Sequence, residues 1–380
     1  MKTEMFIGGD PRLLAGGTAA TTMNYGDTPM TVQTMATPVV TTATMKAGDD
    51  PFGCVAMQGQ KVHSGKVSYH HTPAYNVFLR DDEWPSAGIE LETELRRPDD
   101  DFARAAEQAL HSNWFHFERD GSLDPDHDGI YGYELITEPL PPRAYRSPHL
   151  WFGLQNVVSP WLKSFECPET GLHVHVGLNQ FTEFDAIPID HQMSRMSIGK
   201  MLSALVYYCV ADQAFVDRVV LRKPTHYCCT PAVKGFMDGA KLMRPGGVRA
   251  AELVDYSVAA LIEVRNRWSR DLELAKFRLP GTNYSHSSPV PWIDSTYLTG
   301  GHGTEINQEH TFTVEFRRAK GTIHALSVHR IVELMTSIVR FAGKICREPD
   351  FVVTREAFMD WLINTTTSEA LRNLAKQMKG

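Results

Sequence analysis

Acidic and basic side chains occupy every second position in three short segments of the sequence. These residues are Glu90, Glu92 and Glu94 in the first segment, His173 and His175 in the second, and Glu315 and Arg317 in the third. In a strand, side chains two residues apart project to the same face at a separation of about 6.6 Å. If the three segments share one sheet, one face of that sheet carries clustered carboxylates, imidazoles and a guanidinium.

Such a cluster needs compensating charge, because unpaired buried charges of one sign cost several kcal/mol. Dense hard oxygen ligands suit Mg²⁺ or Mn²⁺, and carboxylates at this spacing can flank two ions roughly 3.5–4 Å apart. Each segment also has an ordinary structural interpretation. Alternating glutamates are typical of a solvent-facing sheet surface, and a Glu-x-Arg pair is typical of a surface salt bridge. Two imidazoles beside apolar residues are costly without a partner, so the three segments together favour a metal site.

The segments are expected to lie in an α+β fold, with an antiparallel sheet and helices packed on one side. Strands are predicted over 89–95, 133–137, 172–177 and 312–317. Helices are predicted over 99–110, 193–220 (the longest core helix), 249–264, 324–346, 354–363 and 367–378. Residues 1–83, rich in small side chains and Thr near the start, are interpreted as an N-terminal extension of β segments and loops. Residues 84–380 are interpreted as one catalytic domain.

Composition excludes several functional classes. The formal net charge of −7 argues against general nucleic-acid binding, which requires a basic face. No apolar run approaches the roughly 18 residues needed to span a membrane, and the first residues lack a secretory pattern. The six cysteines show no CxxC spacing, so we expect reduced thiols in a cytoplasmic protein. No Gly-rich motif ending in Lys-Ser/Thr is present, which excludes a P-loop.

Four motifs in order resemble the amidoligase family of carboxylate–amine ligases. They are Gly88-Ile89-Glu90-Leu91-Glu92, Asp120-Gly121-Ser122 with Glu134-Leu135-Ile136-Thr137-Glu138-Pro139-Leu140, Gly171-Leu172-His173-Val174-His175-Val176-Gly177, and Thr313-Val314-Glu315-Phe316-Arg317. The resemblance covers roughly residues 85–345. It implies a curved, glutamine-synthetase-like catalytic sheet. It also implies ATP-dependent amide formation, in which ATP phosphorylates a carboxylate and an amine then displaces phosphate.

Carried over by position, the resemblance implies five metal ligands for Mg²⁺ or Mn²⁺: Glu90, Glu92, Glu134, His173 and Glu315. Glu90 and Glu92 would hold two metal sites, Glu134 would join one of them and His173 the other. His175, Ser122 and Arg317 would contact ATP. Catalysis would depend on Arg317, which neutralises the phosphoryl group in transfer, together with Glu315 and His175.

Between the His-x-His and Glu-x-Arg motifs, the family usually has a basic and aromatic pair leading to an Asn. This chain offers only approximate equivalents around 276–284. Substrates are expected to be a small-molecule or peptide carboxylate and an amine, and a homo-oligomer is left open. A metal-dependent amidohydrolase using the His-x-His motif is the alternative, as is an inactive structural relative. The hydrolase hypothesis predicts an eight-stranded βα barrel with that motif near its first strand.

Overall fold

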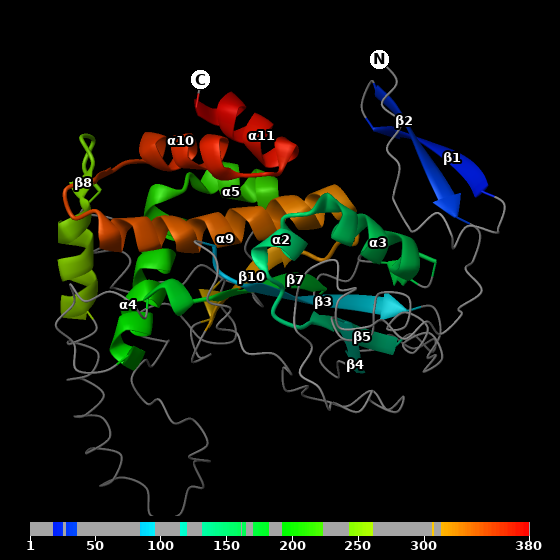
Figure 1. The fold of residues 1–380 in the computed structure, drawn as a ribbon, viewed down its shortest axis with the longest axis horizontal. Helices are drawn as coiled ribbons and strands as arrows, with labels where there is room; N and C mark the ends of the chain where they lie inside the picture. The colour runs from blue at the N-terminus through cyan, green and yellow to red at the C-terminus, as the bar shows by residue number, and fades with distance from the viewer. Residues whose placement is uncertain are drawn as a thin grey trace, which may run out of the picture.

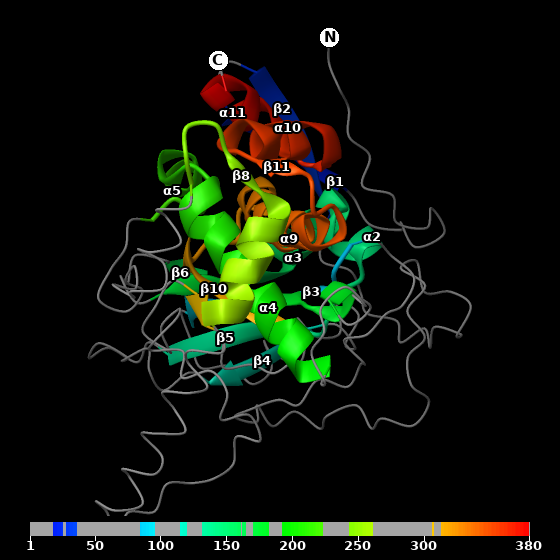
Figure 2. The same ribbon diagram turned by 90° about the vertical axis from the view of Figure 1, so that its left-hand side faces the viewer.

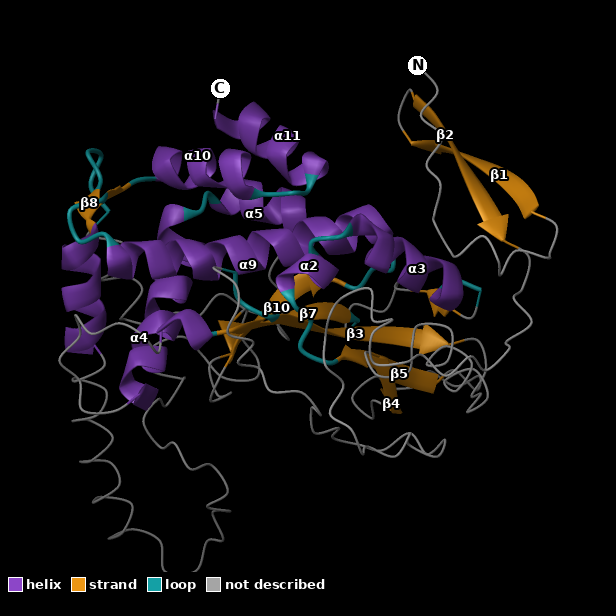
Figure 3. Ribbon diagram, viewed as in Figure 1, coloured by secondary structure: helices purple, strands orange, loops and turns teal. Residues whose placement is uncertain are grey.

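An antiparallel sheet of seven strands underlies the helical part of the molecule (Figures 1 and 3). The computed structural model describes residues 18–25, 28–35, 84–95, 115–119, 131–160, 162–164, 170–181, 192–222, 243–260, 306–307 and 313–379. The strands of the sheet are β3 (Ala87–Leu95), β4 (Phe115–Arg119), β5 (Tyr131–Thr137), β6 (Leu162–Ser164), β7 (Gly171–Gly177), β9 (Ile306–Asn307) and β10 (Thr313–Lys320). Six follow the order β4-β5-β3-β7-β10-β9, β6 also pairs with β3, and every pairing is antiparallel.

Most of the helices lie on one side of this sheet, and α4 (Gln192–Leu205) runs beside one end of it (Figures 1 and 2). The others are α2 (Pro142–Tyr145), α3 (Pro148–Val158), the π-helical segment η3 (Val206–Val210), α5 (Gln213–Val220), a helix over 250–260, α9 (Ala325–Arg347), α10 (Arg355–Thr365) and α11 (Glu369–Lys379). Helix α9 contacts β7, and α10 and α11 contact α9. The structure therefore has a sheet layer, a helix layer centred on α9, and an outer layer of C-terminal helices.

Short elements complete the described part of the chain. A 3₁₀ turn (Asn179–Phe181) follows β7, β8 (Val248–Arg249) pairs with β11 (Val352–Val353), and β1 (Thr18–Tyr25) pairs with β2 (Thr28–Met35) as an antiparallel hairpin. None of the described helices combines the length and apolar character needed to span a bilayer.

Side chains alternate between the two faces of the central strands, as the pleat requires. The face toward the helices carries Ile89, Leu91, Val174, Val314 and Phe316, all of which are almost fully buried. The intervening positions hold the acids and imidazoles. Because one face buries apolar side chains against the helix layer, the polar side chains of the same strands are directed to the opposite face.

The predicted α+β organisation, with an antiparallel sheet and helices on one side, is confirmed. All four predicted strands are present, extended by up to a few residues. The prediction of one long helix over 193–220 is wrong, because the chain leaves helical geometry after η3 and Asp212 caps α5 by accepting hydrogen bonds from Ala214 N and Phe215 N. The longest helix among the described residues is α9. Helices α2 and α3 were not predicted, and the helix expected over 99–110 lies outside the described residues, as does most of 1–83.

Candidate metal centre

Strand register brings the predicted acids and imidazoles together. Glu90 on β3 lies opposite His173 on β7, and His175 lies opposite Glu315 on β10. On the other side of β3, Glu92 lies opposite Glu134 of β5. Directly opposed residues in an antiparallel pair have Cβ atoms about 4.5–5.5 Å apart, so side chains of this length readily meet. Four adjacent strands therefore contribute to one polar cluster at the centre of the sheet.

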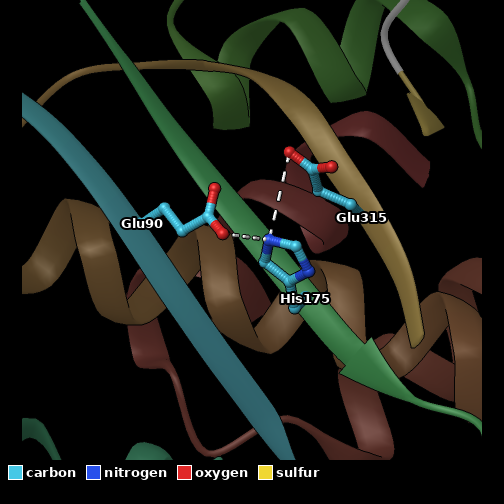
Figure 4. A group of neighbouring side chains, drawn as sticks. All are labelled: Glu90, His175 and Glu315. Carbon is cyan, nitrogen blue, oxygen red and sulfur yellow. Dashed lines mark ion pairs between the residues drawn. The ribbon is translucent and has the colours of Figure 1, made fainter. Parts of the chain in front are cut away.

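His175 lies between two carboxylates that come from the strands on either side of it (Figure 4). Its Nε2 is 2.9 Å from Glu90 Oε1 and 3.9 Å from Glu315 Oε1. Burial alone lowers the pKa of His175, but the two carboxylates outweigh it and raise that pKa to about 9. Burial likewise raises the pKa of Glu90, but His175 and His173 together hold it well below its ordinary value. Both shifts favour the charged forms of the pair.

His173 lies among three carboxylates and is almost fully buried. Its Nδ1 is 3.3 Å from Glu90 Oε2 and 3.4 Å from Glu315 Oε1, and its Nε2 is 3.5 Å from Glu92 Oε1. Each ring nitrogen therefore faces at least one acid. This explains how the sheet accommodates a buried imidazole on its polar face.

Glu92 is positioned by the backbone of β7. Its Oε2 accepts a hydrogen bond of 2.7 Å from Gly171 N. A Cβ on residue 171 would lie 3.0 Å from His173 Nε2 and 3.1 Å from Glu92 Oε2. Glycine at this position thus leaves space for the carboxylate to reach the backbone and for the ring to pack beside it.

Arg317 completes the cluster at β10. Its NH1 donates to Glu315 Oε1 at 2.5 Å. Burial lowers the pKa of Arg317, but Glu315, Glu92 and Glu90 outweigh it, so the guanidinium stays charged. Its Nε is buried and finds no acceptor among the described residues.

Two sets of potential ligand atoms overlap in this cluster. Glu90, His175 and Glu315 form one set, and Glu90, Glu134 and His173 form the other, with the atoms of each set within 4.8 Å of one another. Most of the donors are carboxylate oxygens, which suit Mg²⁺ or Mn²⁺, and the imidazole nitrogens are ligands typical of transition metals. With all acids ionised and the histidines neutral, as metal ligation requires, the four carboxylates of Glu90, Glu92, Glu134 and Glu315 exceed the charge of Arg317 by three. The residues present therefore fit divalent cations.

Seven of the eight predicted site residues come together, and the eighth, Ser122, lies outside the described residues. The grouping differs from the one that the resemblance implied. The resemblance implied separate metal sites for Glu134 and His173, but the two residues belong to the same ligand set. His175, expected to contact ATP, belongs to the other set, and Glu92, expected to be a ligand, belongs to neither. The physical reason is register, because cross-strand partners are fixed by hydrogen bonding between strands and not by spacing along the chain.

Two residues, one in the cluster and one directly beside it, make contacts that the sequence did not predict. Gly171 stands in the quoted motif, but its contact with Glu92 depends on pairing between β3 and β7. Arg318 follows Arg317 and is almost fully buried, on the helical side of β10. No protein-family model matches the chain, and the curated proteins contain no match either.

Proposed function

We propose that this chain is an ATP-dependent carboxylate–amine ligase that uses Mg²⁺ or Mn²⁺ and a glutamine-synthetase-like catalytic sheet. The observation that carries the proposal is the pair of ligand sets sharing Glu90, with the Arg317 guanidinium beside them. Phosphoryl transfer requires little covalent chemistry from the protein, and depends on cations placed around the transferring group. The order of the four sequence motifs adds support from the resemblance.

In the proposed reaction, a carboxylate oxygen of the substrate attacks the γ-phosphorus of ATP, giving an acyl phosphate and ADP. The amine then attacks the acyl carbon and inorganic phosphate leaves, which forms the amide bond. Divalent ions, when bound, supply positive charge to the phosphate oxygens. Glu90, Glu134, His173 and Glu315 would hold them.

The chain's own cations have distinct positions in this scheme. Arg317 and His175 both lie next to Glu315, on adjacent strands. Arg317 would contact the transferring phosphoryl group and stabilise its charge, and His175 would contact a phosphate of ATP. Glu92, held by Gly171 N and close to His173, would orient that ring. The carboxylate and amine would be a small molecule or a peptide.

The sheet topology favours a ligase over an amidohydrolase. The hydrolase hypothesis requires a barrel of parallel strands with the His-x-His motif near its first strand. All strand pairs that the structure describes are antiparallel, and β7 follows at least two acidic strands in the chain. An inactive relative is disfavoured because the acids and imidazoles of both ligand sets are present, with the ligand atoms of each set within 4.8 Å of one another.

Phosphate release by the full chain tests the proposal. The protein is incubated with ATP, Mg²⁺ and pairs drawn from a panel of carboxylates and amines, and products are identified by mass spectrometry. A ligase gives equal amounts of ADP, phosphate and amide only with both substrates present. Amide hydrolysis that is indifferent to ATP would contradict the proposal and support the hydrolase.

Two matched variants on β3 connect the activity to the ligand sets. Glu90→Gln keeps the shape of the side chain and removes the shared ligand, so turnover should be abolished while the fold is retained. Glu94→Gln makes the same change two residues further along the strand, outside both ligand sets, and should leave turnover intact. Full activity in the Glu90 variant would refute the metal assignment.

A further inference from the structure

The strand that carries Glu315 and Arg317 loses regular pairing with β7 after Phe316. The register of β10 on β7 shifts between Phe316 and Ala319, so Arg317 and Arg318 lie in an irregular stretch. β-bulges bend a strand, re-aim its side chains and are frequent beside active sites. Here the two arginines are directed to opposite faces. Arg317 pairs with Glu315 in the acid cluster, which is the group formed by Glu90, Glu92, Glu134 and Glu315. Arg318 instead contacts the helix layer.

Arg318 is clamped by α5. Its NH1 donates to Gln213 Oε1 at 3.2 Å, and its NH2 donates to Asp217 Oδ1. The Arg318 side chain is only 3% exposed. A charged hydrogen bond to a carboxylate is roughly twice as strong as a neutral one, and a planar fork that engages two partners also fixes orientation. The clamp therefore holds the backbone of the bulge against the first two turns of α5.

The residue before Arg317 is also held from the helical side. The rings of Phe316 and Tyr207 have centroids 5.6 Å apart. Tyr207 belongs to the π-helical segment η3, and its carbonyl accepts a hydrogen bond of 2.7 Å from Gln213 Nε2. Gln213 thus links Tyr207 of η3 to Arg318. Single-turn π segments inside helices are frequent at functional sites, because they displace side chains from their helical positions.

We propose that Arg318 is a positioning residue for Arg317. The Arg318–Gln213–Asp217 clamp and the Phe316–Tyr207 contact fix β10 on both sides of Arg317, which aims that guanidinium at the acid cluster. This proposal rests on the proposed function in one respect, because that function identifies the group that Arg317 contacts as the phosphoryl group transferred from ATP. Arg318 itself faces the helices and touches neither ligand set.

A double-mutant cycle measures this dependence. Arg318→Met should lower kcat for ATP turnover about 10–100-fold, with KM for ATP changed less than about threefold, because misplacement of a catalytic group by about 1 Å costs that much in rate. In an Arg317→Met background the same change should add less than about a twofold loss, because coupled residues are not additive. Arg318→Lys, which keeps the charge opposite Asp217, should recover part of the rate.

Arg355→Met is the matched control, because Arg355 also pairs with an aspartate beside α5, Asp212, at the end of that helix away from Asp217. Its kcat should equal that of the wild type. An unchanged kcat in Arg318→Met, or the same fold-loss in both backgrounds, would overturn the proposal. If Arg318→Met does not fold, Asp217→Asn removes one partner of Arg318 and takes its place in the double-mutant cycle. The loss of kcat is then compared in the wild-type and Arg317→Met backgrounds.

Amide hydrogen exchange separates this inference from the proposed function. Arg318→Met should speed exchange within β10 relative to the wild type, whereas Arg355→Met should not. If the wild type shows no Mg²⁺-dependent ATP turnover, the proposed function fails, and exchange alone decides whether Arg318 fixes the bulge. Exchange in β10 equal to that of the wild type would then overturn the clamp.

Discussion

Replacing Glu90 by Gln removes the carboxylate nearest to His175 in the metal-free protein. Glu90 Oε1 lies 2.9 Å from His175 Nε2, compared with 3.9 Å for the closer oxygen of Glu315. Burial alone lowers the pKa of His175, and the two carboxylates raise it from 6.5 to about 9. Because Glu90 is the nearer of them, the variant should return the pKa of His175 to its ordinary value or below it.

The expected change in stability follows from this pKa. One pKa unit corresponds to about 1.4 kcal/mol, so the raised pKa of His175 stabilises the folded state by about 3 kcal/mol. The raised pKa of His175 stabilises the folded state fully at pH values below 6.5, the pKa of the imidazole in the unfolded chain. This stabilisation is lost as the pH rises through about 9, the pKa in the folded protein. Since the pKa of Glu90 is lowered well below 4.5, the pair persists in mild acid. Glu90→Gln should therefore lower the free energy of unfolding by about 2–3 kcal/mol near pH 6, and by progressively less toward pH 9.

Two measurements check this prediction in the presence of a chelator. NMR of histidine-labelled protein follows the titration of His175 across the neutral and alkaline range, and urea unfolding gives the free energy at several pH values. Glu94→Gln is the control, because it makes the same substitution on the same strand. A pKa for His175 that is the same in the wild type and in Glu90→Gln would refute the proposed electrostatic coupling.

Three further predictions address other parts of the structure. Gly171→Ala would place a Cβ 3.0 Å from His173 Nε2, so the ring must shift, and Mn²⁺ affinity measured by calorimetry should fall about tenfold. Glu333→Ala leaves Arg146 without the buried carboxylate 3.0 Å from its Nε, and should lower the free energy of unfolding in urea by about 3–5 kcal/mol. Burial lowers the pKa of Lys200 to about 7, so Lys200→Met should be more stable than the wild type, with a gain that is largest below pH 7 and shrinks toward pH 10.5.

Controls separate these effects from general loss of folding. Gly153→Ala adds a Cβ that meets no atom within 4 Å, and should leave Mn²⁺ affinity unchanged. Equal Mn²⁺ affinity in Gly171→Ala would show that the space beside His173 is unimportant. For Glu333, a loss below about 1 kcal/mol would mean that its hydrogen bonds contribute little. For Lys200, a gain in stability that does not vary with pH would exclude titration as its cause.

The polar alternation in β3, β7 and β10 was predictable because it is local. Glu90 and Glu92, like His173 and His175, share a face through the geometry of a single strand. Their partners were not predictable from spacing, because pairing depends on hydrogen bonds between segments that are distant in the sequence. Glu134 illustrates the difference. It was expected near the metal ligands, but only the register of β5 on β3 places it with His173.

Two helix starts, those of α3 and α5, have local signals in the sequence. Asp212 is a strong N-cap, and it ends the supposed single helix over 193–220 by starting α5. Ser147 followed by Pro148 is likewise a helix start, and α3 begins there. The burial of Arg318 had no such signal. A charged side chain is buried only when partners compensate it, and those partners lie on a helix about a hundred residues earlier in the chain.

The two-faced sheet also protects the fold against mispairing. A slip of one residue between β3 and β7 would exchange the faces of every side chain on the displaced strand. Glutamates or histidines would then enter the layer beneath α9, and isoleucine, leucine and valine would take their places on the polar face. Such an arrangement would bury several unpaired charges at once, at a cost larger than the total stability of a typical domain. The alternation of charged and apolar side chains thus also disfavours pairing of these strands shifted by one residue.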